Sequence, residues 1–192
     1  MNNAAKTPRY NVKEYYQAIQ NSEQPTELLD GELVAMASPS IQHQRICGNL
    51  QFFTKQYIRR NHGACEVFIA PTDVQMDDHN LVIPDVFIAC HPDWFDSQKY
   101  NGAPDFVAEV VSTNRSDDFD RKLWLYRIHG VREYWIIDPK HEKYWFISLR
   151  KVRSRTCIRL IRRFRFGFTR MQNIRCQLSF RNCFKCLECI VQ

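Results

Sequence analysis

Hydrophobic and polar positions recur along the chain with two different periods, and the changes of period separate predicted helices from predicted strands. Apolar side chains at three- and four-residue intervals predict a short amphipathic helix over residues 8–21, a long helix over 41–60 and a third helix over 116–129. We expect Gly63, as the C′ residue, and Gly130 to end the last two helices. The first helix is expected to pack on the outside of a sheet.

Shorter apolar runs between these segments have the β-branched and aromatic content of strands. Asp30-Gly31 predicts a tight hairpin, the runs between 65 and 90 predict an antiparallel meander, and 91–104 predicts a surface loop. The order of elements predicts one α/β (α+β) domain over residues 8–148, with a mixed central sheet flanked by helices. The expected strands lie in residues 26–37, 65–70, 72–76, 81–90, 105–112, 131–139 and 143–149.

Charge divides the chain into two unequal parts. The 192 residues carry a formal net charge of +6, but residues 1–148 hold 15 Lys and Arg against 20 Asp and Glu, whereas residues 149–192 hold 12 against 1. The predicted domain is therefore acidic, and only the tail is basic. A basic whole-chain balance would suggest a nucleic-acid-binding domain, and this distribution removes that argument for the domain itself.

The tail, residues 149–192, lacks a stable hydrophobic period and contains Cys183, Cys186 and Cys189 at metal-ligand spacing, with Cys176 upstream. Three interpretations are open, and we rank them in this order. The tail is a frameshifted or disordered segment, a basic arm for nucleic acid, or a zinc or iron–sulfur site.

No targeting or membrane segment is predicted. The N-terminus is polar and has no apolar signal region, and no run approaches the roughly 20 apolar residues of a membrane span. These features predict a cytoplasmic protein without membrane contact. In a reducing compartment, Cys47, Cys65 and Cys90 are expected to be small buried hydrophobes.

Two carboxylates stand alone in apolar runs, Asp85 after Pro84 and Glu109 in the central strand. A buried carboxylate needs a partner or a metal, so neighbouring strands would let both acids bind Mg²⁺ or Mn²⁺, with the Val110 carbonyl as a further oxygen ligand. Lys122 would orient the attacking water or stabilise the transition state.

The alternative interpretation of these acids is structural. It places Asp85 in an edge strand and pairs Glu109 with Arg121 or Arg132.

Several short blocks occur in an order that resembles one known family. They are Leu29-Asp30-Gly31-Glu32, Pro39 followed by His43, Pro84-Asp85, Ala103-Pro104-Asp105, Glu109-Val110-Val111-Ser112, Lys122-Leu123 with Tyr126, and Gly130 to Trp135 with Asp138. Over about residues 10–148 the chain resembles the Uma family of proposed endonucleases, in the restriction-endonuclease-like PD-(D/E)xK superfamily. The resemblance implies a nuclease core in which Asp85 and Glu109 bind the metal. The superfamily lysine position is Val111 here, and Lys122 on the next helix is its implied counterpart.

Together these features predict a metal-dependent endonuclease that cuts DNA, with a homodimer as a possible assembly. Glu32, near a second metal, and His43, as a phosphate contact or proton carrier, are secondary site candidates, although an exposed strand acid and an ordinary helix histidine explain them equally well. The alternative function is a non-catalytic nucleic-acid-binding or accessory protein that keeps the nuclease fold.

Overall fold

The computed structural model describes residues 9–111, 120–149, 151–152 and 155–156. The described part contains three α-helices and two five-stranded sheets. Each of these sheets has one parallel pair of strands, and its other pairs are antiparallel. This confirms the predicted mixed α/β class. The third helix was predicted from residue 116, and residues 116–119 lie outside the described part, as does most of the tail.

The bounds of the elements are as follows. The helices are α1 (Val12–Ile19), α2 (Ile41–Arg60) and α3 (Lys122–His129), with a short 3₁₀ turn η1 (Pro92–Trp94). The first sheet, in the order β2-β1-β5-β4-β7, contains β2 (Glu32–Ala35), β1 (Thr26–Leu29), β5 (Asn80–Val82), β4 (Asp73–Asp77) and β7 (Lys99–Asn101). The second, in the order β10-β9-β8-β6-β3, contains β10 (Lys143–Ser148), β9 (Glu133–Asp138), β8 (Phe106–Val110), β6 (Val86–Ala89) and β3 (Glu66–Ile69). A two-residue pair, β11 (Lys151–Val152) with β12 (Arg155–Thr156), follows.

Local side-chain caps explain where α1 and α2 begin. Asn11 and Glu14 form a reciprocal capping box at α1, and the Ser40 hydroxyl accepts the His43 amide hydrogen at the start of α2. Each cap satisfies backbone donors that the first turn leaves unpaired.

The end of α2 corrects the expectation for Gly63. The left-handed C′ residue is His62, with φ 51°, and Gly63 is the next residue, whose amide donates to the Ile58 carbonyl at 2.9 Å. The His62 amide also donates to Arg59, which completes a Schellman-type ending one residue earlier than predicted.

The hairpin between β1 and β2 turns at Asp30-Gly31, as predicted. Both turn residues have positive φ, 49° and 78°, which is the backbone that a two-residue type I′ turn needs. A Cβ at Gly31 would also lie within 3.2 Å of the Arg9 and Tyr10 backbone, so glycine is required there on two counts.

The predicted meander over residues 65–90 is wrong. β4 and β5 pair antiparallel in the first sheet, as a meander would require, but β3 and β6 pair with each other in the second sheet, so the four strands do not form one meander. Pro84 separates β5 from β6 in what reads as one apolar run, because proline lacks the amide hydrogen that a continuous ladder uses. The predicted loop 91–104 also contains β7, which runs parallel to β4.

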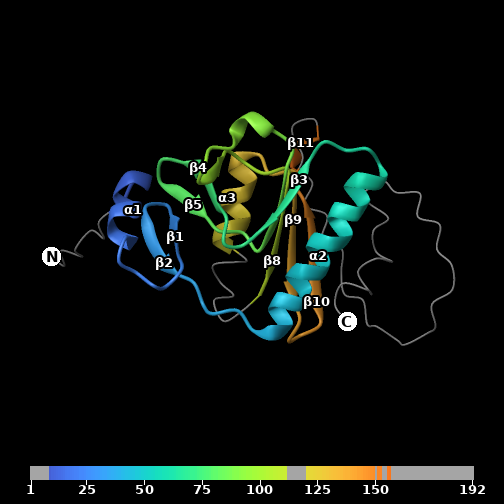
Figure 1. Ribbon diagram of the computed structural model, residues 1–192, viewed down its shortest axis with the longest axis horizontal. Coiled ribbons are helices and arrows are strands. Elements are labelled where there is room, and N and C mark those ends of the chain that lie inside the picture. Colours follow the sequence, from blue (N-terminus) through green and yellow to red (C-terminus); the bar gives the residue numbers. More distant parts are fainter. Residues whose placement is uncertain (1–8, 112–119, 150, 153–154, 157–192) are drawn as a thin grey trace.

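Two layers of apolar side chains enclose the second sheet. On one face, Val86, Ala108 and Ile137 pack with α2 residues such as Ile46 and Leu50. On the other face, Phe87, Val107 and Ile136 pack with Leu125 of α3 and with side chains of the first sheet. Figure 1 shows α2 and α3 as separate helices with the strands of this sheet running between them. Alternation along the strands therefore decides which helix each side chain meets.

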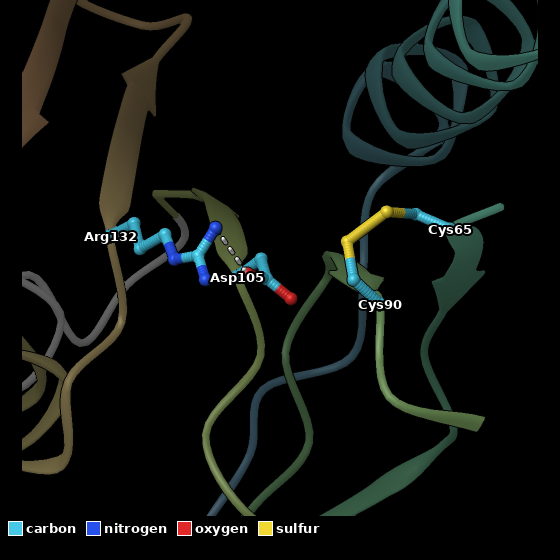
Figure 2. The surroundings of a disulfide bond; sticks show 4 residues. All are labelled: Cys65, Cys90, Asp105 and Arg132. Atoms are coloured by element: carbon cyan, nitrogen blue, oxygen red, sulfur yellow. Dashed lines mark ion pairs between the residues drawn. A yellow bond between two sulfur atoms is a disulfide. The ribbon is translucent and has the colours of Figure 1, made fainter. Parts of the chain in front are cut away.

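The cysteines depart from the prediction of three reduced core residues. Cys65 and Cys90 form a disulfide, because the β3–β6 register pairs Glu66 with Ala89 and so places the adjoining residues opposite each other, with Cα atoms 4.2 Å apart. Figure 2 shows this bridge at the ends of the two strands and the Asp105–Arg132 ion pair nearby. Cys47 alone matches the expectation, as a buried thiol.

Within the described residues, no helix has both the length and the apolar character to cross a membrane.

Candidate active site

The two predicted acids lie opposite each other on adjacent strands. Val86 pairs with Ala108 in the antiparallel β6–β8 ladder, so Asp85 comes next to Glu109. The Asp85 amide donates to Glu109 Oε2 at 3.4 Å, and the Val110 amide donates to Asp85 Oδ2 at 2.7 Å. Both carboxylates are buried, 8% and 3% exposed, at the start of β6 and near the end of β8.

Lys122 reaches the same cluster from the first turn of α3. Its Nζ lies 3.1 Å from Glu109 Oε1 and 3.0 Å from Glu27 Oε2, and the lysine is 4% exposed. Alternation along β8 directs Glu109 to the same face as Val107, which is the face that α3 covers. The structure thus brings the helix lysine to the second acid.

Glu27 is a third buried acid that sequence reasoning missed. It lies in β1, 3% exposed, where its Oε1 accepts the Ile83 amide hydrogen at 2.8 Å and its other oxygen contacts Lys122. The available signal was an acid beside two leucines in a short strand, the same signal that singled out Asp85 and Glu109.

Tyr126 lies one turn beyond Lys122 on α3 and donates its hydroxyl hydrogen to Glu109 Oε1 at 2.8 Å. Burial, reinforced by the negative charge of Glu109, raises the pKa of Tyr126 well above its usual 10. The phenol therefore stays protonated and donates to the carboxylate throughout the neutral range.

His43 lies on the other side of Asp85. Its Nε2 is 3.0 Å from Asp85 Oδ2 and its Nδ1 is 3.5 Å from the Cys47 sulfur, so the ring bridges the two side chains. Ser40 fixes the helix start that presents this histidine. Burial, followed by the charges of Asp85 and Glu109, raises the pKa of the Cys47 thiol, which argues against a nucleophilic cysteine here.

Glu32, the other secondary candidate, lies outside this buried cluster. Its carboxylate is half-exposed at the start of β2 and pairs with Arg121 at 2.9 Å. Arg121 also donates to the Leu29 carbonyl at 2.5 Å and so fastens the β1–β2 hairpin.

Two details of the structural alternative differ from the structure, the edge-strand position of Asp85 and the arginine partner of Glu109. Asp85 leads into β6, which lies between β8 and β3 and is not an edge strand. Arg132 pairs with Asp105, at the opposite end of β8 from Glu109, and Arg121 contacts Asp30 and Glu32 on the hairpin. The named arginines therefore do not account for the burial of Glu109.

The charge balance of the cluster suits a divalent cation. Glu27, Asp85 and Glu109 supply three carboxylates, whereas Lys122 supplies one ammonium. Carboxylate oxygens are the hard ligands that Mg²⁺ prefers, and an added cation would offset the excess negative charge in a buried setting. At Val110 the structure defines the amide contact to Asp85, while the carbonyl as a ligand stays a prediction.

Comparison with known proteins identifies a family. A family model described as "Uma2: Putative restriction endonuclease" matches residues 12–157. Two uncharacterized proteins of Synechocystis sp. PCC 6803 are similar. The protein sll1609 is 29% identical over 145 residues, or 70% of this chain and 77% of the relative, and slr1290 is 28% identical over 126 residues, or 64% and 65%.

One solved structure is similar in fold, a crystal structure described as "a putative nuclease belonging to DUF820" from Anabaena variabilis. Its TM-score is 0.61 at 16% identity, and the match covers 74% of this chain and 81% of that one. At this identity the likeness concerns the fold.

Proposed function

The chain belongs to the Uma2 family, whose model is described as "Putative restriction endonuclease", and from that premise we propose that it is a metal-dependent endonuclease that hydrolyses phosphodiester bonds in DNA. The observation that carries the proposal is the contact of Asp85 with Glu109 across two strands, with Lys122 on Glu109. Two carboxylates and a lysine in this arrangement supply the charges that phosphodiester hydrolysis needs.

In the proposed mechanism, Asp85 and Glu109 would hold Mg²⁺ or Mn²⁺ through their carboxylate oxygens. When bound, the ion would polarise the phosphate and lower the pKa of a bound water. Lys122, held between Glu27 and Glu109, stabilises charge that develops on the phosphate oxygens. The Val110 amide fixes the Asp85 carboxylate, and its carbonyl is a proposed further ligand.

The two secondary candidates, His43 and Glu32, differ in their position relative to the acids of the site. His43 contacts Asp85 directly and is proposed to orient that carboxylate. A role for Glu32 would require its release from Arg121, and we retain it only as a residue to be tested in the same assay.

The test uses the purified full chain, plasmid DNA and added Mg²⁺ or Mn²⁺. Asp85→Asn and Glu109→Gln keep the side-chain shapes and remove the charges, and each is expected to lower cleavage about 100-fold or more. Asp105→Asn is the matched control, because Asp105 is also an ion-paired acid, located at the opposite end of β8, and should leave cleavage unchanged.

Circular dichroism would establish that each variant is folded, and calorimetry would measure Mg²⁺ binding. Unchanged cleavage in both acid variants would overturn the assignment. DNA binding without cleavage or Mg²⁺ binding by the wild type would favour the non-catalytic alternative.

A further inference from the structure

A second set of ligands lies on the α2 side of Asp85. His43 and Cys47 are four residues apart, so they lie on the same face of α2, one turn apart. One ligand atom each from His43, Cys47 and Asp85 lie within 4.8 Å of one another, and all three residues are buried. Among the residues that the structure describes, no other group of three His, Cys, Asp or Glu side chains has its ligand atoms this close together.

We propose that His43, Cys47 and Asp85 form a binding site for a zinc-class ion, Zn²⁺ or Co²⁺, that shares Asp85 with the proposed magnesium site. The binding itself does not depend on nuclease activity. A regulatory consequence, inhibition by zinc, rests on the proposed function.

The ligand types select the class of ion. Sulfur and imidazole nitrogen suit Zn²⁺ and Co²⁺, whereas Mg²⁺ takes oxygen ligands and has little affinity for sulfur. Three protein ligands with an open fourth position are the usual number for a reactive or exchangeable zinc site, in contrast to the four of a structural site.

The ligand atoms of His43, Cys47 and Asp85 would have to move slightly closer together to bind one ion. Zinc bonds of about 2.0–2.3 Å place tetrahedral ligand atoms about 3.2–3.8 Å apart. The His43–Asp85 and His43–Cys47 contacts, 3.0 and 3.5 Å, are already close to this range, although they use opposite nitrogens of the ring. An ion would therefore take one ring nitrogen, and a rotation of the imidazole or thiol would bring the third ligand closer.

Binding displaces one proton. Cys47 is a free cysteine, and formation of a metal–sulfur bond with a thiol releases its proton to solvent. The carboxylates of Asp85, Glu109 and Glu27 favour the entry of a cation, so the cost of losing the proton is offset by the charge that arrives.

Occupation of this site would remove Asp85 from the magnesium site. Its carboxylate would be held toward His43 and Cys47, away from the ion that Glu109 shares. Zn²⁺ is therefore expected to inhibit Mg²⁺-dependent cleavage, and removal of Cys47 is expected to relieve the inhibition.

Cobalt absorption tests the site directly. The full chain with the tail cysteines Cys157, Cys176, Cys183, Cys186 and Cys189 changed to Ser is titrated with Co²⁺, because those residues could bind the ion themselves. We expect one equivalent to produce visible cobalt bands and a near-ultraviolet sulfur-to-cobalt charge-transfer band, both lost on adding Zn²⁺. That charge-transfer band reports a bound cysteine sulfur specifically.

Cys47→Ala and Cys47→Ser in this background should abolish the charge-transfer band. Loss of a hydrogen bond that supports a metal ligand lowers metal affinity about 10- to 100-fold. Loss of the ligand itself should therefore weaken Co²⁺ binding by more than that. Two variants guard against misfolding, and circular dichroism checks each. A charge-transfer band unchanged in either folded variant, or no band in the parent, would overturn the proposal.

The cleavage assay separates this inference from the proposed function. If the enzyme cuts DNA with Mg²⁺, then Cys47→Ala should keep that activity and lose inhibition by Zn²⁺. Equal inhibition of both proteins would contradict a regulatory site at Cys47. If no cleavage is found, the cobalt spectrum still decides whether the site binds metal.

Discussion

Lys122 forms ion pairs with two of the buried acids of the site. Its ammonium lies between Glu27 and Glu109, two buried carboxylates from different sheets. Breaking a buried ion pair by removing one partner is costly, so replacement of either carboxylate should lower stability although Lys122 keeps the other as its partner. The contribution of each residue can therefore be tested by isosteric replacement.

Glu27→Gln should destabilise the protein far more than Glu32→Gln. The Glu27 side chain is 4% exposed and pairs with Lys122, whereas that of Glu32 is 48% exposed and pairs with Arg121. We expect losses of about 3 kcal/mol at Glu27 and about 1 kcal/mol or less at Glu32 in the free energy of unfolding. Urea unfolding at neutral pH measures both, and equal losses would refute the assignment of Glu27 to a buried pair.

The sequence predicts Asp85 and Glu109 because each is one acid in a long apolar run. Glu27 escapes the same reasoning because β1 is only four residues long and is buried on both faces. Leu28 packs beneath α1, and Leu29 packs in the core shared with the second sheet. A two-residue alternation cannot reveal that burial, since it depends on elements that lie far away in the sequence.

At the scale of elements, β3 is the edge strand of the second sheet. It pairs with β6 along one side, and α2 packs against it. The Cys65–Cys90 disulfide links the ends of these two strands and so fastens the edge to the strand that Asp85 leads into.

Loss of that disulfide should lower stability without altering the site residues. A Cys65→Ser and Cys90→Ser double variant is expected to lose about 3 kcal/mol of unfolding free energy, which is typical for a disulfide that closes a loop as long as the one between Cys65 and Cys90. Urea unfolding with and without reductant measures the loss. Reductant should destabilise the wild type and leave the double variant unchanged, and an equal response of both proteins would contradict the bridge.

Local signals predict the helices and the first hairpin, while strand pairing needs the whole fold. Asn11, Ser40 and Asp30-Gly31 act within a few residues of themselves, so the chain alone reveals them. The parallel pairing of β7 with β4 joins segments more than twenty residues apart and leaves no local periodic signal. Cys65 and Cys90 are equally distant partners, and the number of cysteines alone does not pair them.

At the scale of the molecule, the site lies where the two sheets meet. The connection from β5 to β6 carries Ile83, Pro84 and Asp85, and the Ile83 amide donates to Glu27 of the first sheet. The sheets therefore share the hydrogen bonds that fix the acids. Buried tyrosine hydroxyls recur around this core, and they make global stability depend on pH in the alkaline range.

Several tyrosines have pKa values above the usual 10, mainly because burial disfavours the phenolate. Burial and then Asp105 raise the pKa of Tyr100 to about 12, and the pKa values of Tyr15, Tyr16, Tyr126 and Tyr144 are raised as well. Above pH 10 the unfolded chain loses these protons while the folded protein keeps them. The unfolded state then binds fewer protons, so unfolding becomes easier as the pH rises.

Unfolding free energy should thus be steady between neutral pH and about pH 9 and fall between pH 10 and 12. Each tyrosine that ionises only after unfolding contributes a slope of about 1.4 kcal/mol per pH unit. Tyr126→Phe should reduce the slope by one such contribution, although it also removes the hydrogen bond to Glu109 and lowers stability at neutral pH. Urea unfolding across this range separates the two effects, because the lost hydrogen bond shifts the whole curve and the lost proton changes its slope. A variant whose curve is displaced but parallel to the wild type would show that Tyr126 ionises in the folded protein as readily as in the unfolded chain.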